Sequence, residues 1–142
     1  IRAGVGEGVL IGGYSRNFAM MFGSPYFSFD PNADYILFIE DHERFSKPDA
    51  VSEYLAAIWQ HPFMRRVRGF IFGCYNNAGT PPEELVALLA LIGERYDIPV
   101  AYTNDIGHGT RHGVLPMGCR VRLDGGAGTL EFLERTIARR KS

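Results

Sequence analysis

The chain has 142 residues, 46% of them hydrophobic, which is the size and composition of one compact domain covering residues 1–142. Its 15 basic and 16 acidic residues leave a formal charge of −1, so no attractive field recruits a polyanion and nucleic acid is excluded as an expected partner. No apolar stretch approaches the ~20 residues that a bilayer-spanning helix needs, so a membrane is not an expected partner either.

The first half of the chain alternates apolar runs with helical patterns. A strand is expected at residues 9–11, followed by a short helix for which Ser15 is the N-cap. A second apolar run, at residues 35–39, predicts a buried strand. Apolar residues at helical spacing then predict a helix over residues 51–59, with Ser46 placed to cap it.

The same alternation continues through the middle of the chain. Apolar runs at residues 69–72 and 98–102 predict two more strands that are covered on both faces. Between them, helical spacing predicts a helix through residues 85–92. Thr80 and Glu83 precede it at the spacing of a capping box, which predicts where this helix begins.

The end of the chain has a different pattern. Residues 121–123 and 129–132 alternate between apolar and polar side chains around the glycine-rich stretch 124–128, which predicts a β-hairpin. Together with the preceding alternation of strands and helices, this predicts an α/β fold in a single layered domain. Its sheet is expected to be mixed and largely parallel, with flanking helices and a C-terminal β-hairpin.

An acid and a histidine follow two of the expected strands. Glu40 and Asp41 come directly after the strand at 35–39, and His108 lies in a glycine-rich loop beyond the strand at 98–102. In open parallel sheets, ligands gather at the carboxyl ends of strands. A carboxylate and a histidine that meet there have the chemistry of the orienting acid and the general base of a nucleophilic enzyme.

One serine stands in the chain order that a complete triad would need. Ser15 precedes Glu40 and His108, as the nucleophile does in α/β-hydrolases. A nucleophile elbow, however, has glycine two residues after the serine, where this chain has Asn17. The helix-capping role of Ser15 is therefore preferred, and no nucleophile is identified within the chain.

A metal site is the other chemical alternative. His108 and His112 are four residues apart, and residues 40–42 supply further donors. The glycines beside the histidines argue against one helix face carrying both, so neither a metal nor a cofactor is predicted. His42 is interpreted as a surface residue at the end of a strand, and His61 as a residue that caps the helix before Pro62.

Several short segments occur in an order that is characteristic of one family. They are Gly12-Gly13, Phe22-Gly23-Ser24-Pro25-Tyr26, Ile36-Leu37-Phe38-Ile39-Glu40-Asp41, Gly69-Phe70-Ile71-Phe72-Gly73, Gly107-His108 and Leu115-Pro116-Met117-Gly118. In this order the segments resemble the carboxy-terminal domain of the LD-carboxypeptidase and microcin-C immunity family of serine peptidases. The resemblance covers almost the whole chain.

The resemblance implies a swivelling β/β/α domain that supplies two members of a Ser-Glu-His triad. Glu40 would be the acid and His108 the base, while the serine nucleophile would lie in an N-terminal domain of the same protein. The implied substrate is an LD-peptide, such as a murein tetrapeptide, or alternatively a peptidyl or aminoacyl nucleotide of the microcin-C type. The isolated chain would then be inactive. A homodimer is also implied, as is a family without a cofactor.

Departures from the family pattern mark candidate substrate-binding residues. Tyr14 stands where members often carry asparagine after the glycine pair, and His112 stands where a small hydroxyl residue is common. Gly13, Tyr14, Asp41 and Arg111 are the candidates for contact with a substrate. A different class of function is also kept open, in which the domain is a non-catalytic binding or dimerisation module.

The cysteines bear on the cellular location of the protein, and the first residue bears on where its native N-terminus lies. Cys74 and Cys119 lie far apart without metal-binding or redox-motif spacing, which favours buried, reduced thiols and a cytoplasmic protein. The chain begins at Ile1 rather than at methionine, so we expect the native N-terminus, with any signal peptide, to lie outside it.

Overall fold

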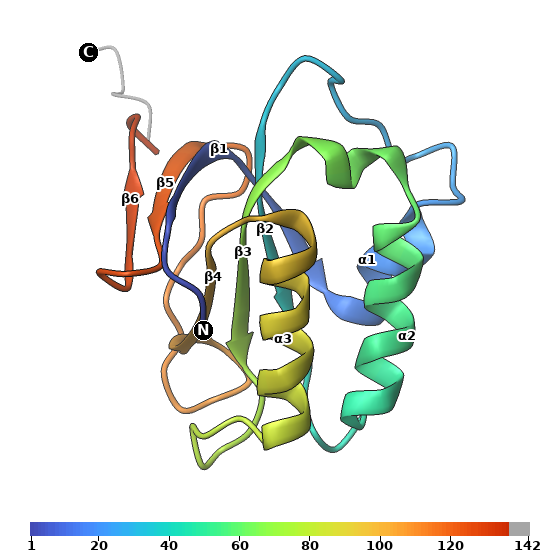
Figure 1. The fold of residues 1–142 in the computed structure, drawn as a ribbon, viewed down its shortest axis with the longest axis vertical. Coiled ribbons are helices and arrows are strands. Elements are labelled where there is room, and N and C mark those ends of the chain that lie inside the picture. Colours follow the sequence, from blue (N-terminus) through green and yellow to red (C-terminus); the bar gives the residue numbers. More distant parts are fainter. Residues whose placement is uncertain (137–142) are drawn as a thin grey trace, which may run out of the picture.

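The structure, a computed structural model, describes residues 1–136 and has one six-stranded mixed sheet at its centre (Figure 1). The strands are β1 (Val5–Tyr14), β2 (Tyr35–Glu40), β3 (Val67–Cys74), β4 (Val100–Gly107), β5 (Arg120–Asp124) and β6 (Thr129–Phe132). Their order across the sheet is β4-β3-β2-β1-β5-β6. Strands β1 to β4 pair in parallel, whereas β5 and β6 add an antiparallel edge beside β1. The predicted α/β class, the mixed sheet and the C-terminal hairpin are therefore confirmed.

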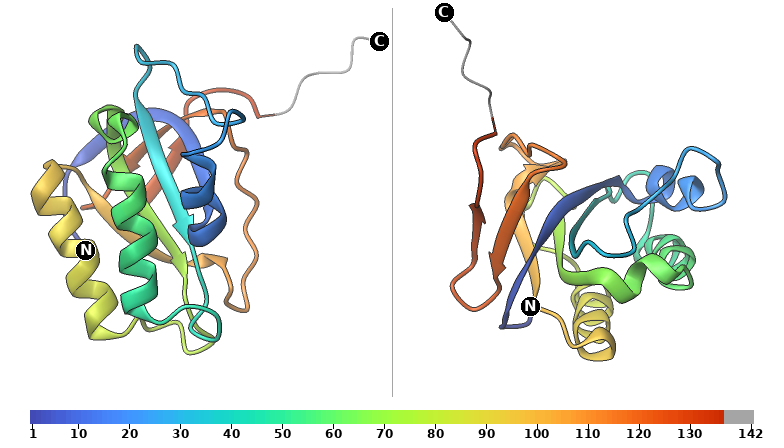
Figure 2. Two further views of the ribbon diagram at one scale, coloured as in Figure 1. Left: turned by 90° about the vertical axis from the view of Figure 1, so that its right-hand side faces the viewer. Right: turned by 90° about the horizontal axis from the view of Figure 1, so that it is seen from above.

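Helices cover one face of the sheet. They are α1 (Ser15–Met21), α2 (Pro48–Trp59), the 3-10 helix η1 (Pro62–Arg66) and α3 (Glu83–Tyr96). Figure 2 shows the three α-helices on the same side of the sheet, away from the β5–β6 hairpin. The period of two along β2 explains this layer, because Leu37 and Ile39 point to the helices while Ile36 and Phe38 point to the opposite face.

The opposite face of the sheet forms a second, smaller core. Leu10 and Ile71 are buried there with Val121 and Leu123 of the hairpin. Leu115, from the connection between β4 and β5, packs against the same cluster. The hairpin and this connection therefore cover one face of the sheet, as the helices cover the other.

Three predicted helix caps are wrong. Ser15 is the first residue of α1, and Tyr14 takes the N-cap position that was predicted for Ser15. The other two caps are wrong for one physical reason. Residues that precede proline are held extended, so Lys47, just before Pro48, becomes the N-cap of α2 in place of Ser46. The capping box of Thr80 and Glu83 fails in the same way, because Pro81 itself precedes a proline and cannot occupy a first helical turn. Helix α3 instead begins at Glu83, with no side-chain cap.

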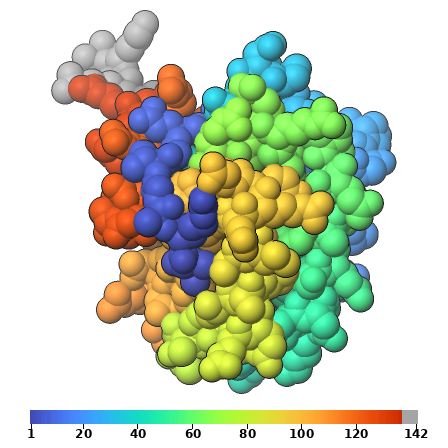
Figure 3. All heavy atoms as spheres, viewed as in Figure 1, coloured from blue at the N-terminus to red at the C-terminus, as the bar shows by residue number. Residues whose placement is uncertain are grey.

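The first residues of the chain lie against α3 and β4, as Figure 3 shows. The Arg2 backbone pairs with Val100, and the Arg2 guanidinium contacts Asp97 at 2.6 Å, where α3 ends. Both cysteines are free thiols; Cys74 is buried as predicted, whereas Cys119 is only partly buried.

Candidate active site

The parallel strands bring the predicted acid and base to one edge of the sheet. Strand β1 ends at Tyr14, β2 at Glu40, β3 at Cys74 and β4 at Gly107, immediately before His108. Because these four strands are parallel and adjacent, their carboxyl ends lie side by side. This is the edge at which open α/β sheets bind ligands.

Glu40 and His108 meet at this edge. Oε2 of Glu40 lies 3.6 Å from Nδ1 of His108, and the two side chains are 27% and 33% exposed. This is an ion-pair distance beyond the range of a hydrogen bond, and His108 Nδ1 has no hydrogen-bond partner within residues 1–136. Catalytic hydrogen bonds are often long in the absence of a substrate. The pair thus has the arrangement of an acid that orients a histidine through Nδ1 and leaves Nε2 available.

The backbone around His108 is fixed against β3. The His108 N–H donates to the Cys74 carbonyl at 2.9 Å. Gly107 has a φ of 112°, and a Cβ there would lie 2.6 Å from the Cys74 backbone nitrogen. A Cβ on Gly109 would lie 2.6 Å from the Cys74 sulfur. Both glycines are therefore required for the loop to approach β3 and place His108 beside Glu40.

Asp41 is buried directly behind this pair. Its side chain is fully buried, and Oδ1 accepts from the Tyr14 hydroxyl at 2.8 Å and from the His42 N–H at 2.6 Å. Oδ2 accepts from the Ser15 hydroxyl. With both oxygens engaged, Asp41 has no surface to offer a substrate, so its geometry favours an ordering role over the predicted substrate contact.

Gly13, Arg111 and Ser15 differ in how accessible they are to a substrate. A Cβ on Gly13 would meet nothing within 4 Å, so open space lies beside the end of β1. Arg111 is 75% exposed and forms an ion pair with Asp105 at 2.9 Å, which raises the pKa of its guanidinium. Ser15 is completely buried and donates to Asp41, a position that no substrate carbonyl could reach.

His42 is the residue that the sequence interpretation placed wrongly. It was expected at the surface, but its side chain is only 7% exposed. Its ring packs against that of His108, with centroids 5.3 Å apart at 65°. His61 is a capping residue, but of the helix that follows it: its Nδ1 accepts from the Phe63 N–H at the start of η1, whereas Gln60 is the C-cap of α2. The only clue to a buried His42 is its place directly after the apolar strand and Asp41.

Tyr14 is protonated throughout the ordinary pH range. Burial, and then the hydrogen bond to the Asp41 carboxylate, raise the pKa of Tyr14 to about 12 from 10.0. Burial raises the pKa of Tyr75 to about 12 as well, with the nearby charge of Asp41 adding to the effect. Both phenols therefore act as hydrogen-bond donors in the folded protein.

These shifted values predict a loss of stability in strong base. Between pH 10 and pH 12 the unfolded chain releases these phenolic protons while the folded chain keeps them, so the free energy of unfolding should fall as the pH rises. Tyr14→Phe should make the fall shallower in urea titrations across this range. Tyr26 is 89% exposed and meets water in both states, so Tyr26→Phe is the control. If the free energy of unfolding of Tyr14→Phe fell with pH as steeply as that of the unmodified protein, the raised pKa of Tyr14 would be contradicted.

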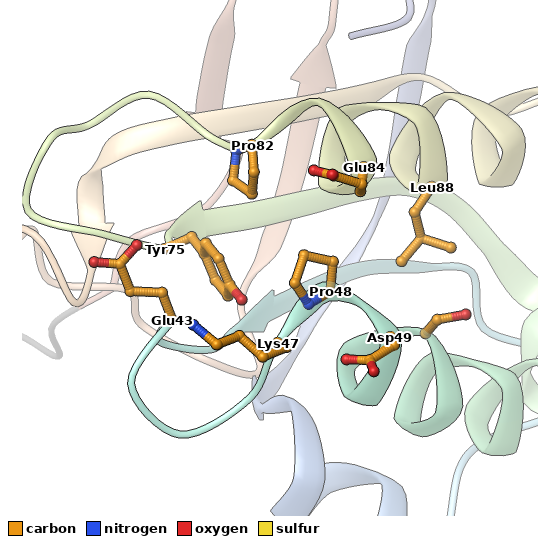
Figure 4. A pocket seen from close by; sticks show the side chains of 9 residues that line it. Glu43, Lys47, Pro48, Asp49, Tyr75, Pro82, Glu84 and Leu88 are labelled. Carbon is orange, nitrogen blue, oxygen red and sulfur yellow. The ribbon is translucent and has the colours of Figure 1, made fainter.

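A separate hollow of about 680 Å³ lies between the starts of α2 and α3. Figure 4 shows the side chains around it, which come from these two helices and from the loops after β2 and β3. Glu43, Asp49 and Glu84 make its rim acidic, with Lys47 as the basic side chain. Neither Glu40 nor His108 lines it, so the candidate active site rests on the paired side chains and not on this hollow.

Neither a cluster of metal-binding side chains nor a membrane-spanning helix is found in the part of the chain that the structure describes. No group of three or more histidine, cysteine, aspartate or glutamate side chains among residues 1–136 is placed to hold a metal ion. In particular, His112 is exposed in the loop after His108. No helix in the same residues has both the length and the apolar character to cross a membrane.

Comparison with known proteins gives a consistent result. The family model of the LD-carboxypeptidase C-terminal domain matches residues 7–123. A protein of Treponema pallidum (strain Nichols) named "Putative carboxypeptidase" is 30% identical over 119 residues, which are 82% of this chain. The match covers 34% of that protein, so the chain spans about a third of the length of this curated relative.

Solved structures share the fold. The muramoyltetrapeptide carboxypeptidase of Oxalobacter formigenes matches with a TM-score of 0.72 and 24% identity, over 90% of this chain and 44% of that one. An MccF-like protein of Streptococcus pneumoniae, solved in complex with AMP, matches with a TM-score of 0.74 and 21% identity. That match covers 90% of this chain and 41% of the other. At these identities the likeness establishes the fold.

Proposed function

This chain belongs to the family of LD-carboxypeptidase C-terminal domains, and from that membership we propose that it supplies the acid and the base of a serine-type hydrolase. Glu40 is the acid and His108 is the general base. In the reaction, His108 Nε2 takes the proton from a serine hydroxyl as the oxygen attacks the substrate carbonyl. It then returns that proton to the leaving amine.

The observation that carries this proposal is the approach of Glu40 to His108 at the carboxyl edge of the sheet. With Nδ1 of His108 3.6 Å from Glu40 Oε2, the carboxylate can hold the ring and stabilise the imidazolium that forms when Nε2 gains a proton. The pair is partly exposed, so a nucleophile and a substrate have access to it.

We propose that the nucleophile comes from an N-terminal domain of the same protein. Support comes from Ser15, the serine with the triad-like chain order, which is buried against Asp41. Support also comes from length, because the chain covers 34% of its curated relative and 44% of the Oxalobacter formigenes structure. On this proposal residues 1–142 alone are inactive, since a base without a nucleophile and an oxyanion hole has nothing to activate. The homodimer and the cytoplasmic location stay predictions.

The proposed substrate is an LD-peptide, with cleavage at its carboxyl-terminal amide bond. This class is supported by the family description and by the muramoyltetrapeptide carboxypeptidase among the structural matches. A second candidate is a peptidyl or aminoacyl nucleotide. It is supported by the matches to an MccF-like protein holding AMP and to MccF, the microcin C7 self-immunity protein.

The test compares the two substrate classes with the full-length protein. Purified protein is incubated with a murein tetrapeptide and, separately, with an aminoacyl sulfamoyl nucleotide or a peptidyl nucleotide, and the released products are followed by liquid chromatography. Release of the terminal amino acid from the tetrapeptide, at a kcat/KM well above that for the nucleotide, is the expected result. Preferential cleavage of the nucleotide would select the second candidate. Binding of both without turnover would favour the non-catalytic module.

A further inference from the structure

The ring of His108 contacts two other rings. Tyr14 packs against it with centroids 5.6 Å apart at 68°, and His42 does so at 5.3 Å and 65°. Both arrangements are edge-to-face, a geometry that aromatic pairs prefer. His108 is therefore held by more than the Glu40 carboxylate.

The same buried carboxylate holds the Tyr14 side chain and the backbone of His42. Asp41 Oδ1 accepts from the Tyr14 hydroxyl and from the His42 backbone N–H. Asp41 itself is held through Oδ2 by the Ser15 hydroxyl, at the start of α1. Hydrogen bonds to a charged, buried acceptor are stronger than those between neutral groups. The Tyr14 ring and the His42 backbone thus have little freedom to move away from His108.

A further hydrogen bond holds the His42 ring itself. Nδ1 of His42 accepts from the Arg44 N–H at 3.0 Å, so this nitrogen carries a lone pair and the ring proton lies on Nε2. This bond keeps the His42 ring in place against the ring of His108.

We propose that Tyr14 and His42 are positioning residues that hold the His108 ring toward Glu40, with Asp41 acting through both of them. This inference rests on the proposed role of His108 as general base. It gives Tyr14 a different task from reading the substrate, because the Tyr14 hydroxyl is already committed to Asp41. Residues that keep a base in reactive geometry lower the barrier without touching the substrate.

Substitutions in the full-length protein separate positioning from substrate contact. Tyr14→Leu and His42→Leu remove a ring while keeping an apolar side chain, and each should lower kcat by about 10- to 100-fold with KM changed less than about twofold. Tyr14→Phe keeps the ring and should retain most of kcat. Tyr26→Leu is the matched control, because Tyr26 is 89% exposed and contacts none of these rings. A rise in KM at unchanged kcat would overturn the proposal and make Tyr14 a substrate contact.

A second readout needs no turnover. In protein labelled with 15N-histidine, NMR should find His42 protonated at Nε2 only and His108 protonated at Nδ1, facing Glu40. Tyr14→Leu and His42→Leu should turn the His108 signals into an average of two tautomers, whereas Tyr14→Phe should not. Unchanged His108 signals in both leucine variants would refute the positioning role. If His108→Ala itself leaves turnover intact, the proposed function fails, and these spectra still decide the positioning role.

Discussion

His108→Ala and Glu40→Gln, each made in the full-length protein, should lower kcat by on the order of 10²–10⁴-fold. Without His108 no group takes the proton from the nucleophile. Glu40→Gln keeps the size of the side chain but removes the charge that stabilises the imidazolium, and its amide can turn an N–H toward Nδ1 and select the wrong tautomer. The effect should therefore fall on kcat more than on KM.

The matched control is Glu43→Gln. Glu43 is an exposed carboxylate three residues after Glu40, and it lines the separate hollow between α2 and α3. Loss of its charge should leave kcat within about twofold, because Glu43 is exposed to solvent, where water and salt weaken its field, and it forms no ion pair with His108 among the described residues. Steady-state kinetics on the tetrapeptide provide the measurement. Equal losses in Glu43→Gln and Glu40→Gln would mean that net charge, and not the triad geometry, governs turnover.

Gly12→Ala is expected to unfold the domain or leave it severely destabilised. Gly12 has a φ of 150°, and a Cβ built on it would lie 1.6 Å from the carbonyl oxygen of Phe38 on the paired strand β2. That oxygen belongs to backbone and cannot turn aside, so β1 and β2 would have to separate. We expect a loss of on the order of 4 kcal/mol or more in the free energy of unfolding.

The neighbouring glycine is the control for this effect. Gly13 has a φ of 154°, close to that of Gly12, but a Cβ there meets nothing within 4 Å. Gly13→Ala should therefore cost only the backbone strain, about 1–3 kcal/mol. Urea unfolding followed by circular dichroism compares the two variants. Equal losses for both would show that φ alone, and not the approach of Phe38, makes glycine necessary.

The elements of the fold could be predicted because each carries a local pattern. The buried strand β2 reads as a continuous apolar run, and α2 and α3 repeat apolar residues at helical spacing. Strand β1 extends from Val5 to Tyr14, well beyond the predicted residues 9–11. Its first half contains glycines in place of an apolar run, and it is a strand because it pairs with β5. Such pairing depends on residues more than a hundred positions away, so no local pattern reports it.

The candidate site could be predicted in part, because two of its residues directly follow predicted strands. Glu40 and His108 follow strands, and parallel pairing alone brings strand ends together, so their meeting needed no knowledge of side-chain packing. The surroundings of His108 did need it. His42 is a polar residue in a turn, for which exposure is the usual expectation, and it is buried because Asp41 holds its backbone and His108 covers its ring.

The measurement that bears most directly on the split active site is labelling of the full-length protein with a fluorophosphonate, a reagent that reacts with activated serines, followed by peptide mass spectrometry. We expect one modified serine outside residues 1–142, with labelling strongly reduced in His108→Ala and unaffected in Ser15→Ala. Modification of Ser15, or undiminished labelling of the nucleophile in His108→Ala, would contradict this expectation.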